Sequence, residues 1–250
     1  MANILETQSL SKRFGGFTAL SSVDLRVEEG SIHGLIGANG AGKTTCFNLL
    51  TKFLEPSQGR ILHRGEDITG MKPAAVARRG MVRSFQISAV FPHLSVLNNL
   101  RAALQLRNGL ADQFWLSDKR LHVLDERALQ LIADVNLSEF RDTLAGELAY
   151  GRKRALEIAT TLALDPNVLL LDEPMAGIGQ AEMPRIVELV RRVAKGRTVV
   201  MVEHNLSVVA NLCDRVTVLQ RGEILTEGSY AEVAADPRVR EAYMGSERAR

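Results

Sequence analysis

Alternation of apolar and polar side chains marks the first part of the chain. Val23, Leu25 and Val27 alternate with polar neighbours, and a similar alternation runs through the preceding residues. A period of two is typical of antiparallel strands with one solvated face. We therefore predict a β-rich segment over residues 3–27, interrupted by a glycine turn at residues 15–16.

The middle of the chain has a different pattern. Between residues 87 and 164 glycine is sparse, and leucines recur at helical spacing from Leu97 onward. This change predicts a helical lobe over residues 87–164, inserted into a core lobe formed by residues 1–86 and 165–250.

The last third alternates between apolar strands and helices. Residues 168–171 are fully apolar, as in a buried parallel strand. Such alternation is typical of a doubly wound α/β sheet. The predicted helices span 180–194 and 206–212, and the predicted strands span 198–202 and 216–220.

A glycine-rich turn lies between an apolar strand at residues 32–36 and a helix predicted from about Lys43. Its spacing is G-x-x-x-x-G-K-T, and it reads Gly37-Ala38-Asn39-Gly40-Ala41-Gly42-Lys43-Thr44-Thr45. Glycines let backbone N–H groups approach phosphate oxygens, and the helix start adds its positive end. An ordinary glycine turn rarely reproduces the whole spacing. We predict an α/β fold with a P-loop NTPase core, made of a mixed sheet and an antiparallel β-subdomain, plus the inserted helical lobe.

Within this turn each side chain has an expected role. Lys43 is predicted to contact the β- and γ-phosphates, and the Thr44 hydroxyl to bind Mg²⁺. Thr45 is predicted to help hold the α-phosphate. The implied cofactors are ATP and Mg²⁺.

Two acids follow the apolar run 168–171. Asp172 and Glu173 stand at the carboxyl end of a predicted strand, where open α/β sheets bind ligands. A solvated strand end is the alternative, but an unpaired carboxylate is costly beside a buried strand. We predict that Asp172 positions Mg²⁺ and that Glu173 is the general base that orients the attacking water.

Three further positions carry weaker signals. His204 follows the strand 198–202 and is predicted to contact the γ-phosphate. A lone histidine is more often structural, but its position at the end of a neighbouring strand favours the contact. Gln86 ends a strand that begins at Met81 and is predicted to touch Mg²⁺ or the attacking water. The helix that opens at residues 148–154 has a basic first turn, which opposes the helix dipole, so an incoming anion would relieve the conflict. A solvated basic turn is the alternative there.

In this order, the motifs resemble those of the ATP-binding cassette ATPases over nearly the whole chain. The resemblance implies that Phe14 stacks on adenine, that Gln86 is a hinge and that His204 is a switch. It also identifies Leu148–Arg152 as the signature segment, which completes the nucleotide site of an opposite subunit. ATP would then close a dimer of cassettes, and hydrolysis would reopen it. The signature residues expected to bind ATP are Ala149, Tyr150 and Gly151.

The chain also shows a narrower resemblance, to the ATPase subunits of branched-chain amino acid importers. It rests on the sequence Leu-Ala-Tyr-Gly, on the long segment between Gln86 and Leu148, and on residues 236–245. It implies membrane permease partners, a second cassette subunit (a paralogue or a second copy) and, indirectly, a periplasmic or extracellular solute-binding protein. The protein would lie on the cytoplasmic face of the inner membrane, held there by the permease. Ala149 and Arg152 depart from the commoner serine and glutamine, and the loop 175–179 lacks the usual aspartate or asparagine.

Composition limits the alternatives. The formal net charge is +2, from 31 basic and 29 acidic side chains, and gives no support to a nucleic-acid partner. Cys46 and Cys213 are isolated, as expected of reduced thiols in the cytosol. No signal peptide is expected, and no apolar run approaches the ~18 residues of a membrane span. A soluble cassette that acts as a nucleotide switch and a P-loop kinase are the other hypotheses; the single cassette and the Asp172-Glu173 pair count against them.

Overall fold

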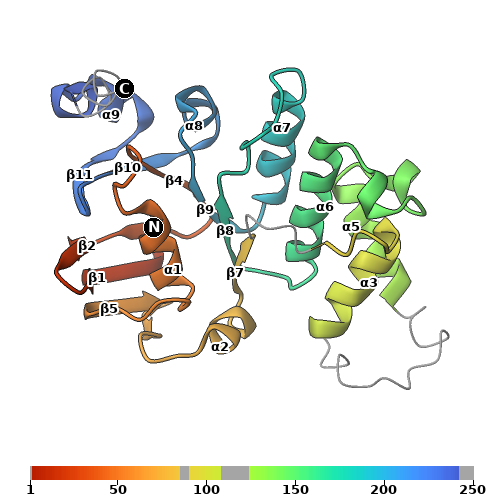
Figure 1. Cartoon of the computed structure of the whole chain (residues 1–250), viewed down its shortest axis with the longest axis horizontal. Coiled ribbons are helices and arrows are strands. Elements are labelled where there is room, and N and C mark those ends of the chain that lie inside the picture. Colours follow the sequence, from red (N-terminus) through yellow and green to blue (C-terminus); the bar gives the residue numbers. More distant parts are fainter. Residues whose placement is uncertain (1, 85–89, 108–123, 242–250) are drawn as a thin grey trace. The chain divides into compact units, whose positions relative to one another are not determined.

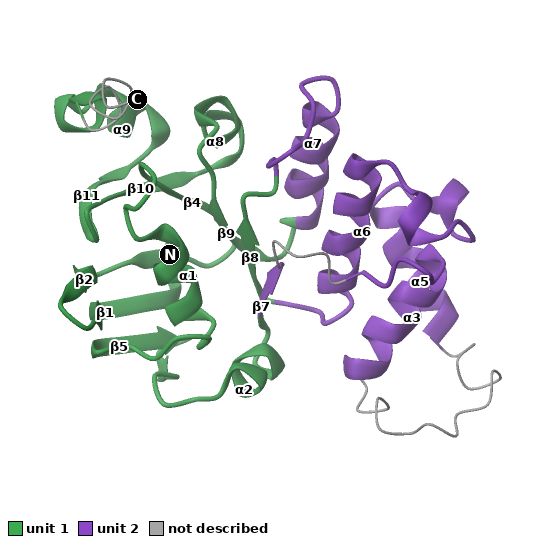
Figure 2. Ribbon diagram, viewed as in Figure 1, with its two compact units in different colours: residues 1–81, 167–174, 194–250 green, residues 82–166, 175–193 purple. Residues whose placement is uncertain are grey.

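The structure is a computed structural model of the 250-residue chain and describes residues 2–84, 90–107 and 124–241 (Figure 1). The chain forms two compact units, coloured in Figure 2. Unit 1 comprises Met1–Met81, Asn167–Pro174 and Ala194–Arg250; unit 2 comprises Val82–Pro166 and Met175–Val193.

Unit 2 is larger than the predicted helical lobe, because it also contains residues 82–84, 165–166 and 175–193. α7 (Met183–Val193) belongs to unit 2, although its sequence position placed it in the predicted core lobe. It packs against α6 (Tyr150–Leu162) of the same unit through buried residues such as Ile186 and Leu189. Nothing in the local sequence pattern shows which neighbour an amphipathic helix will cover.

The smaller sheet of unit 1 is antiparallel throughout. Its strand order is β2-β1-β5-β6, with β3 also paired to β1. The hairpin turn between β1 and β2 falls at Gly15–Gly16, as the pattern predicts. The strands are β1 (Asn3–Phe14), β2 (Phe17–Val23), β3 (Arg26–Glu28), β5 (Gln58–His63) and β6 (Glu66–Asp67).

The larger sheet is mixed, in the order β11-β10-β4-β9-β8-β7. β10, β4, β9 and β8 run parallel, and β11 is antiparallel to β10. Every residue of β4, β8 and β9 is buried, which explains their continuous apolar runs. The strands are β4 (Ile32–Ile36), β7 (Met81–Ser84), β8 (Val168–Asp172), β9 (Thr198–Val202), β10 (Arg215–Gln220) and β11 (Glu223–Gly228).

The strand order of this sheet determines where the site forms. β4 lies next to β9, and β9 lies next to β8. Because neighbouring parallel strands end at the same edge, the segments that follow β4, β8 and β9 are brought together there. These segments are the glycine-rich loop, the Asp172-Glu173 pair and the Glu203-His204 pair.

Unit 1 also contains short helices. α1 starts at Lys43 as predicted, and it ends at Leu50, before Lys52 takes a left-handed conformation (φ 62°). Asn205 caps α8 by accepting the N–H groups of Ser207 and Val208. The helices are α1 (Lys43–Leu50), α2 (Pro73–Arg78), α8 (Leu206–Leu212) and α9 (Tyr230–Ala235).

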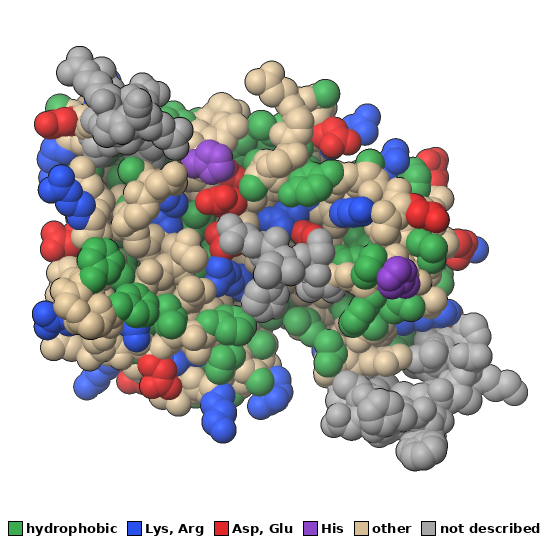
Figure 3. All heavy atoms as spheres, viewed as in Figure 1, with side chains coloured by type: hydrophobic (Ala, Val, Ile, Leu, Met, Phe, Trp, Pro, Cys, Tyr) green, Lys and Arg blue, Asp and Glu red, His purple; other side chains and the backbone are tan. Residues whose placement is uncertain are grey.

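Unit 2 is helical. α3 packs on α5 and α6 through buried leucines that include Leu100, Leu104 and Leu131. On the face drawn in Figure 3, Lys and Arg side chains are interspersed with Asp and Glu. No helix in the described part of the chain has the length and apolarity to cross a bilayer. The remaining elements are α3 (Val96–Arg107), α5 (Asp125–Asp134), η2 (Ser138–Phe140) and η3 (Ala145–Glu147).

Candidate active site

The glycine-rich loop borders a cavity in unit 1. The cavity has a volume of about 280 Å³, and Glu173 lines it together with the loop. Gly42 precedes α1 in a left-handed conformation (φ 105°), and a β-carbon there would lie 2.8 Å from the Ala19 carbonyl oxygen. A larger residue would therefore displace either the loop or β2. The lining residues are Phe17, Ala19, Asn39, Gly40, Ala41, Gly42, Lys43, Thr44, Thr45 and Glu173.

Lys43 is held inside the loop. Its Nζ donates hydrogen bonds to the carbonyl oxygens of Gly37 (2.7 Å) and Ala38 (3.0 Å), and the residue is only 7 % exposed. Burial lowers the pKa of Lys43, whereas the carboxylates of Glu173 and Asp172 oppose this shift. A desolvated ammonium beside free N–H groups at a helix start is suited to bind phosphate oxygens.

The two predicted acids differ in conformation. Asp172 is the last residue of β8 and is buried, whereas Glu173 has φ 47°, an uncommon conformation for a residue other than glycine. The Glu173 N–H donates to the Val202 carbonyl oxygen of β9 (2.9 Å), which holds this turn. The turn leaves Glu173 lining the cavity, so the local strain accompanies the placement of a carboxylate at the phosphate loop.

The donor set fits a magnesium ion that the substrate completes. In the described part of the chain, no group of three or more His, Cys, Asp or Glu residues is arranged to hold a metal. Mg²⁺ commonly binds one or two protein oxygens together with substrate phosphates and water. The Thr44 hydroxyl at the loop and the Asp172 carboxylate at the end of β8 are oxygen donors of this kind.

His204 follows β9, and its side chain is exposed. Its backbone is fixed by Glu203, which is fully buried and accepts the N–H groups of His204 (3.2 Å) and Asn205 (3.4 Å) through Oε2. The sequence interpretation gave Glu203 no role. An acid directly after an apolar strand, the same signal as for Asp172, would have found it.

Residues 20–176 match the ABC transporter family. The chain belongs to this family and is one of its ATPases. A second match, over residues 223–249, is to the branched-chain amino acid ATP-binding cassette transporter family.

Relatives match the cassette over nearly its full length. The high-affinity branched-chain amino acid transport ATP-binding protein BraF of Pseudomonas aeruginosa is 38 % identical, with 97 % of this chain and 98 % of BraF covered. LivG of Escherichia coli, which has the same descriptive name, is 35 % identical, with 97 % and 98 % covered. The ADP conformation of the cassette MJ1267 superposes with a TM-score of 0.86 at 32 % identity, with 98 % and 100 % of the chains covered.

The cassette places two aromatic rings at the β1–β2 hairpin. Phe14, predicted to stack on adenine, is 46 % exposed, and Lys12 Nζ lies 5.1 Å from its ring centroid. Phe17 pairs with Phe14 across the hairpin and lines the cavity. The sequence resemblance assigned the adenine contact to Phe14 and not to Phe17. That Phe17 lines the cavity depends on where the hairpin packs, which the local pattern does not show. The role of Phe14 stays a prediction.

The remaining predicted residues lie elsewhere. Gln86 lies outside the described residues. Ala149, Tyr150 and Gly151 open α6 in unit 2, where Ala149 is the N-cap residue. Arg152, unusual at its position in the signature, lies over the Phe140 ring with 4.0 Å between its guanidinium carbon and the ring centroid. The site roles of these residues stay predictions.

Proposed function

We propose that the cassette is the ATP-hydrolysing subunit of a membrane importer for branched-chain amino acids or related amino acids and amides. The observation that carries this proposal is the cavity that brings Lys43, Thr44 and Glu173 together at the phosphate loop. The names of BraF and LivG and the match at residues 223–249 support the solute class.

Each residue of the site has a task in this chemistry. Backbone N–H groups of the loop and Lys43 hold the β- and γ-phosphates. Thr44 and Asp172 hold Mg²⁺, which when bound neutralises phosphate charge. Glu173 accepts a proton from the attacking water and orients it, and His204 donates a hydrogen bond at the γ-phosphate.

A second cassette completes the site in this proposal. The phosphate loop belongs to unit 1 and the signature segment to unit 2. We propose that the signature of another subunit, either a copy or a paralogue, closes over the ATP held by this chain. ATP binding then favours a closed pair, and hydrolysis reopens it.

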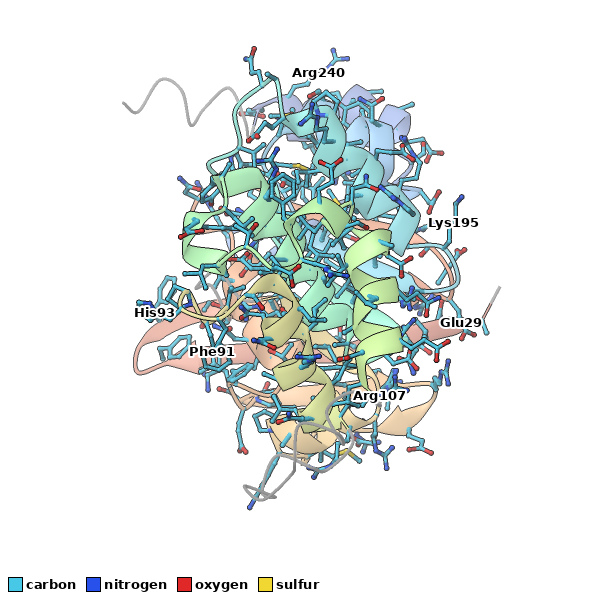
Figure 4. All side chains as sticks on the ribbon, turned by 90° about the vertical axis from the view of Figure 1, so that its right-hand side faces the viewer. Glu29, Phe91, His93, Arg107, Lys195 and Arg240 are labelled. Atoms are coloured by element: carbon cyan, nitrogen blue, oxygen red, sulfur yellow. The ribbon has the colours of Figure 1, made fainter. Side chains whose placement is uncertain are left out.

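Unit 2 has a surface suited to a permease. Phe91 (57 % exposed), Leu94 (37 %) and Leu144 (41 %) form what we name the apolar edge. Their segments are joined by a bridge between Ser95 and Leu144, and the Ala145 N–H donates to the Leu94 carbonyl oxygen (2.9 Å). Figure 4 shows the rings of Phe91 and His93 pointing outward near the start of α3. Exposed apolar groups on a fixed loop favour a protein partner, and we propose that this edge contacts the permease at the cytoplasmic face of the membrane.

Glu173→Gln tests the catalytic assignment. The amide has the shape of the carboxylate but cannot accept the proton, so ATP still binds while hydrolysis by the purified complex falls at least about 100-fold. The matched control Glu223→Gln changes an exposed acid at the first position of β11, next to the hairpin turn, and leaves the rate unchanged. Hydrolysis by Glu173→Gln at the wild-type rate would overturn the assignment.

Leu94→Glu tests the permease contact. We expect the variant to bind ATP normally but to lose recovery with membranes that contain the co-expressed permease. Leu129→Glu, at a 40 % exposed leucine of α5 outside the apolar edge, is the control. If both variants remain bound to the permease, the edge is not the docking surface. Recovery with ribosomes or nucleic acid in place of membranes would favour a nucleotide switch.

A further inference from the structure

Tyr150 makes a contact within unit 2 that the proposed mechanism does not use. Its hydroxyl donates a hydrogen bond to the Ala176 carbonyl oxygen (3.0 Å), in the loop that follows Glu173. The ring packs against Gly177, where a β-carbon would lie 3.0 Å from Oη and 3.1 Å from Cζ. Gly177 also has φ 73°, so both its conformation and the ring favour a residue without a side chain.

A reciprocal contact lies beside the first. A β-carbon at Gly151 would be 2.8 Å from Oε2 of Glu182, so this glycine leaves room for the Glu182 carboxylate. The signature segment and the segment 175–182 thus interlock, because each contributes one glycine and one side chain that packs over the other's glycine. This arrangement joins the start of α6 to the loop between β8 and α7 within a single chain.

The loop that follows Glu173 also buries the side chains of Met175 and Ile178. It contains Gly177 and Gly179, and a hydrogen bond from the Ile178 N–H to the Met175 carbonyl oxygen (3.1 Å) closes a turn within it. Met175 is separated from Glu173 by one residue, and Glu173 itself has a strained conformation. A change in the path of the loop therefore bears directly on the orientation of the Glu173 carboxylate.

We propose that Tyr150 is a positioning residue for hydrolysis, which fixes the loop after Glu173 through its hydroxyl and its ring. The proposal rests on the general-base role proposed for Glu173. In this proposal the hydroxyl and ring of Tyr150 are engaged by the loop of their own chain, so its variants lower kcat while leaving the KM for ATP nearly unchanged. A change in KM instead would report the contact with the ATP of the opposite subunit that the signature resemblance implies. The contact also couples the signature segment to the catalytic acid of the same subunit, in a loop that lacks the aspartate or asparagine usual in the family.

The test is a double-mutant cycle on the full-length cassette, with ATP hydrolysis followed as phosphate release. Tyr150→Phe keeps the ring and removes one hydrogen bond, and kcat falls about fivefold with KM within about twofold of wild type. Tyr150→Ser and Gly177→Ala each lower kcat by about tenfold or more. The double variant, Tyr150→Ser with Gly177→Ala, has a kcat no lower than that of the slower single variant. Without the tyrosine ring, the methyl group added at residue 177 has no neighbour to displace.

Two controls separate positioning from general damage. Gly196→Ala puts alanine at φ 74° with no atom within 4 Å of its β-carbon, so it imposes the same backbone strain without the contact. Tyr230→Phe removes a hydroxyl elsewhere in the chain. Both keep the wild-type kcat. Since Tyr150 is 55 % exposed, its variants are expected to keep the wild-type melting temperature within about 2 °C.

Three outcomes overturn the proposal: additive losses in the cycle, a wild-type kcat in Tyr150→Ser, or a rise in KM without a fall in kcat. Failure of the underlying mechanism has a different signature, namely wild-type hydrolysis by Glu173→Gln. If Glu173→Gln is inactive while the Tyr150 variants keep full activity, only the positioning role is refuted.

Discussion

Asn99 holds the loop that carries the apolar edge, and we predict that the substitution Asn99→Ala opens this loop. The residue is 2 % exposed on α3. Its Oδ1 accepts the Phe91 N–H (2.7 Å), and its Nδ2 donates to the carbonyl oxygens of Phe91 (3.1 Å), Leu94 (3.2 Å) and Ser95 (3.0 Å). One side chain thus fixes the backbone over residues 91–95.

The free energy lost in Asn99→Ala depends on which hydrogen-bond partners of Asn99 also have a second hydrogen bond. The three carbonyl oxygens also accept backbone N–H groups, those of Leu94, Ala145 and Asn99 itself, so each loses a supplementary bond of roughly 0.5 kcal/mol. The Phe91 N–H has no second acceptor among the described residues, and its loss costs about 1–2 kcal/mol. The sum is about 3 kcal/mol, which corresponds to roughly a 100-fold increase in the population of the open loop.

Hydrogen exchange at the Phe91 amide measures this opening directly. We expect exchange about 100-fold faster in Asn99→Ala than in the wild type. Asn99→Asp separates the two halves of the amide, because it keeps an acceptor for Phe91 but directs a carboxylate at three carbonyl oxygens. At neutral pH it is therefore at least as destabilising as alanine.

The control is Asn98→Ala on the next residue of α3, an exposed asparagine whose Oδ1 accepts a bond from Arg101 (3.0 Å). In Asn98→Ala we expect the Phe91 amide to exchange at the wild-type rate. Unchanged exchange at Phe91 in Asn99→Ala would refute the claim that this side chain fixes the loop. If exchange at Phe91 is faster in Asn99→Ala but binding to the permease is undiminished, the conformation of this loop is not required for docking.

Three further predictions concern unit 1, which contains the phosphate loop. Burial lowers the pKa of His33 to about 4, with Arg215 adding to the shift and Glu227 opposing it. Because the folded pKa lies below the unfolded value, stability is complete above about pH 6.5 and falls by up to about 3 kcal/mol toward pH 4; urea unfolding of His33→Gln should lose this component. Phe17→Ala is expected to weaken ATP binding about tenfold in calorimetry, and Phe14→Ala less than about threefold, because only Phe17 is among the residues that line the cavity. The opposite ranking would assign the adenine to Phe14. Glu203→Gln weakens the acceptor that fixes His204, so kcat should fall about fivefold with KM unchanged; a change in KM alone would contradict this.

Local patterns predicted most of the fold, because the elements are determined by short stretches of sequence. The apolar runs of β8 and β9 and the alternation in β1 reflect burial on both faces and on one face of a sheet. The phosphate loop is recognisable from its spacing, which is required by backbone approach to an anion. By contrast, the assignment of α7 to unit 2 and the position of Phe17 at the cavity depend on contacts between separate elements.

Tyr150 and Gly177 show the same limit within the site. Each is interpretable alone, Tyr150 as part of a signature and Gly177 as part of a loop that lacks the usual aspartate or asparagine. Their contact spans 27 positions of the sequence, and the hydrogen bond to Ala176 spans 26. Residue types predict which chemistry is possible, whereas the folded backbone determines which residue restrains which.

Asp172 and Glu203 show why a motif alone does not assign a role. Both are acids at or just after the end of a fully buried apolar strand, β8 for Asp172 and β9 for Glu203, and the sequence signal is the same. In the structure the Glu203 carboxylate accepts two backbone N–H groups of the segment that enters α8, which commits it to holding that segment. Asp172 instead immediately precedes the strained Glu173 that lines the cavity, and its charge acts on the buried Lys43 ammonium. We therefore propose that Glu203 is a positioning group, and that Asp172 holds the cation that accompanies the phosphate.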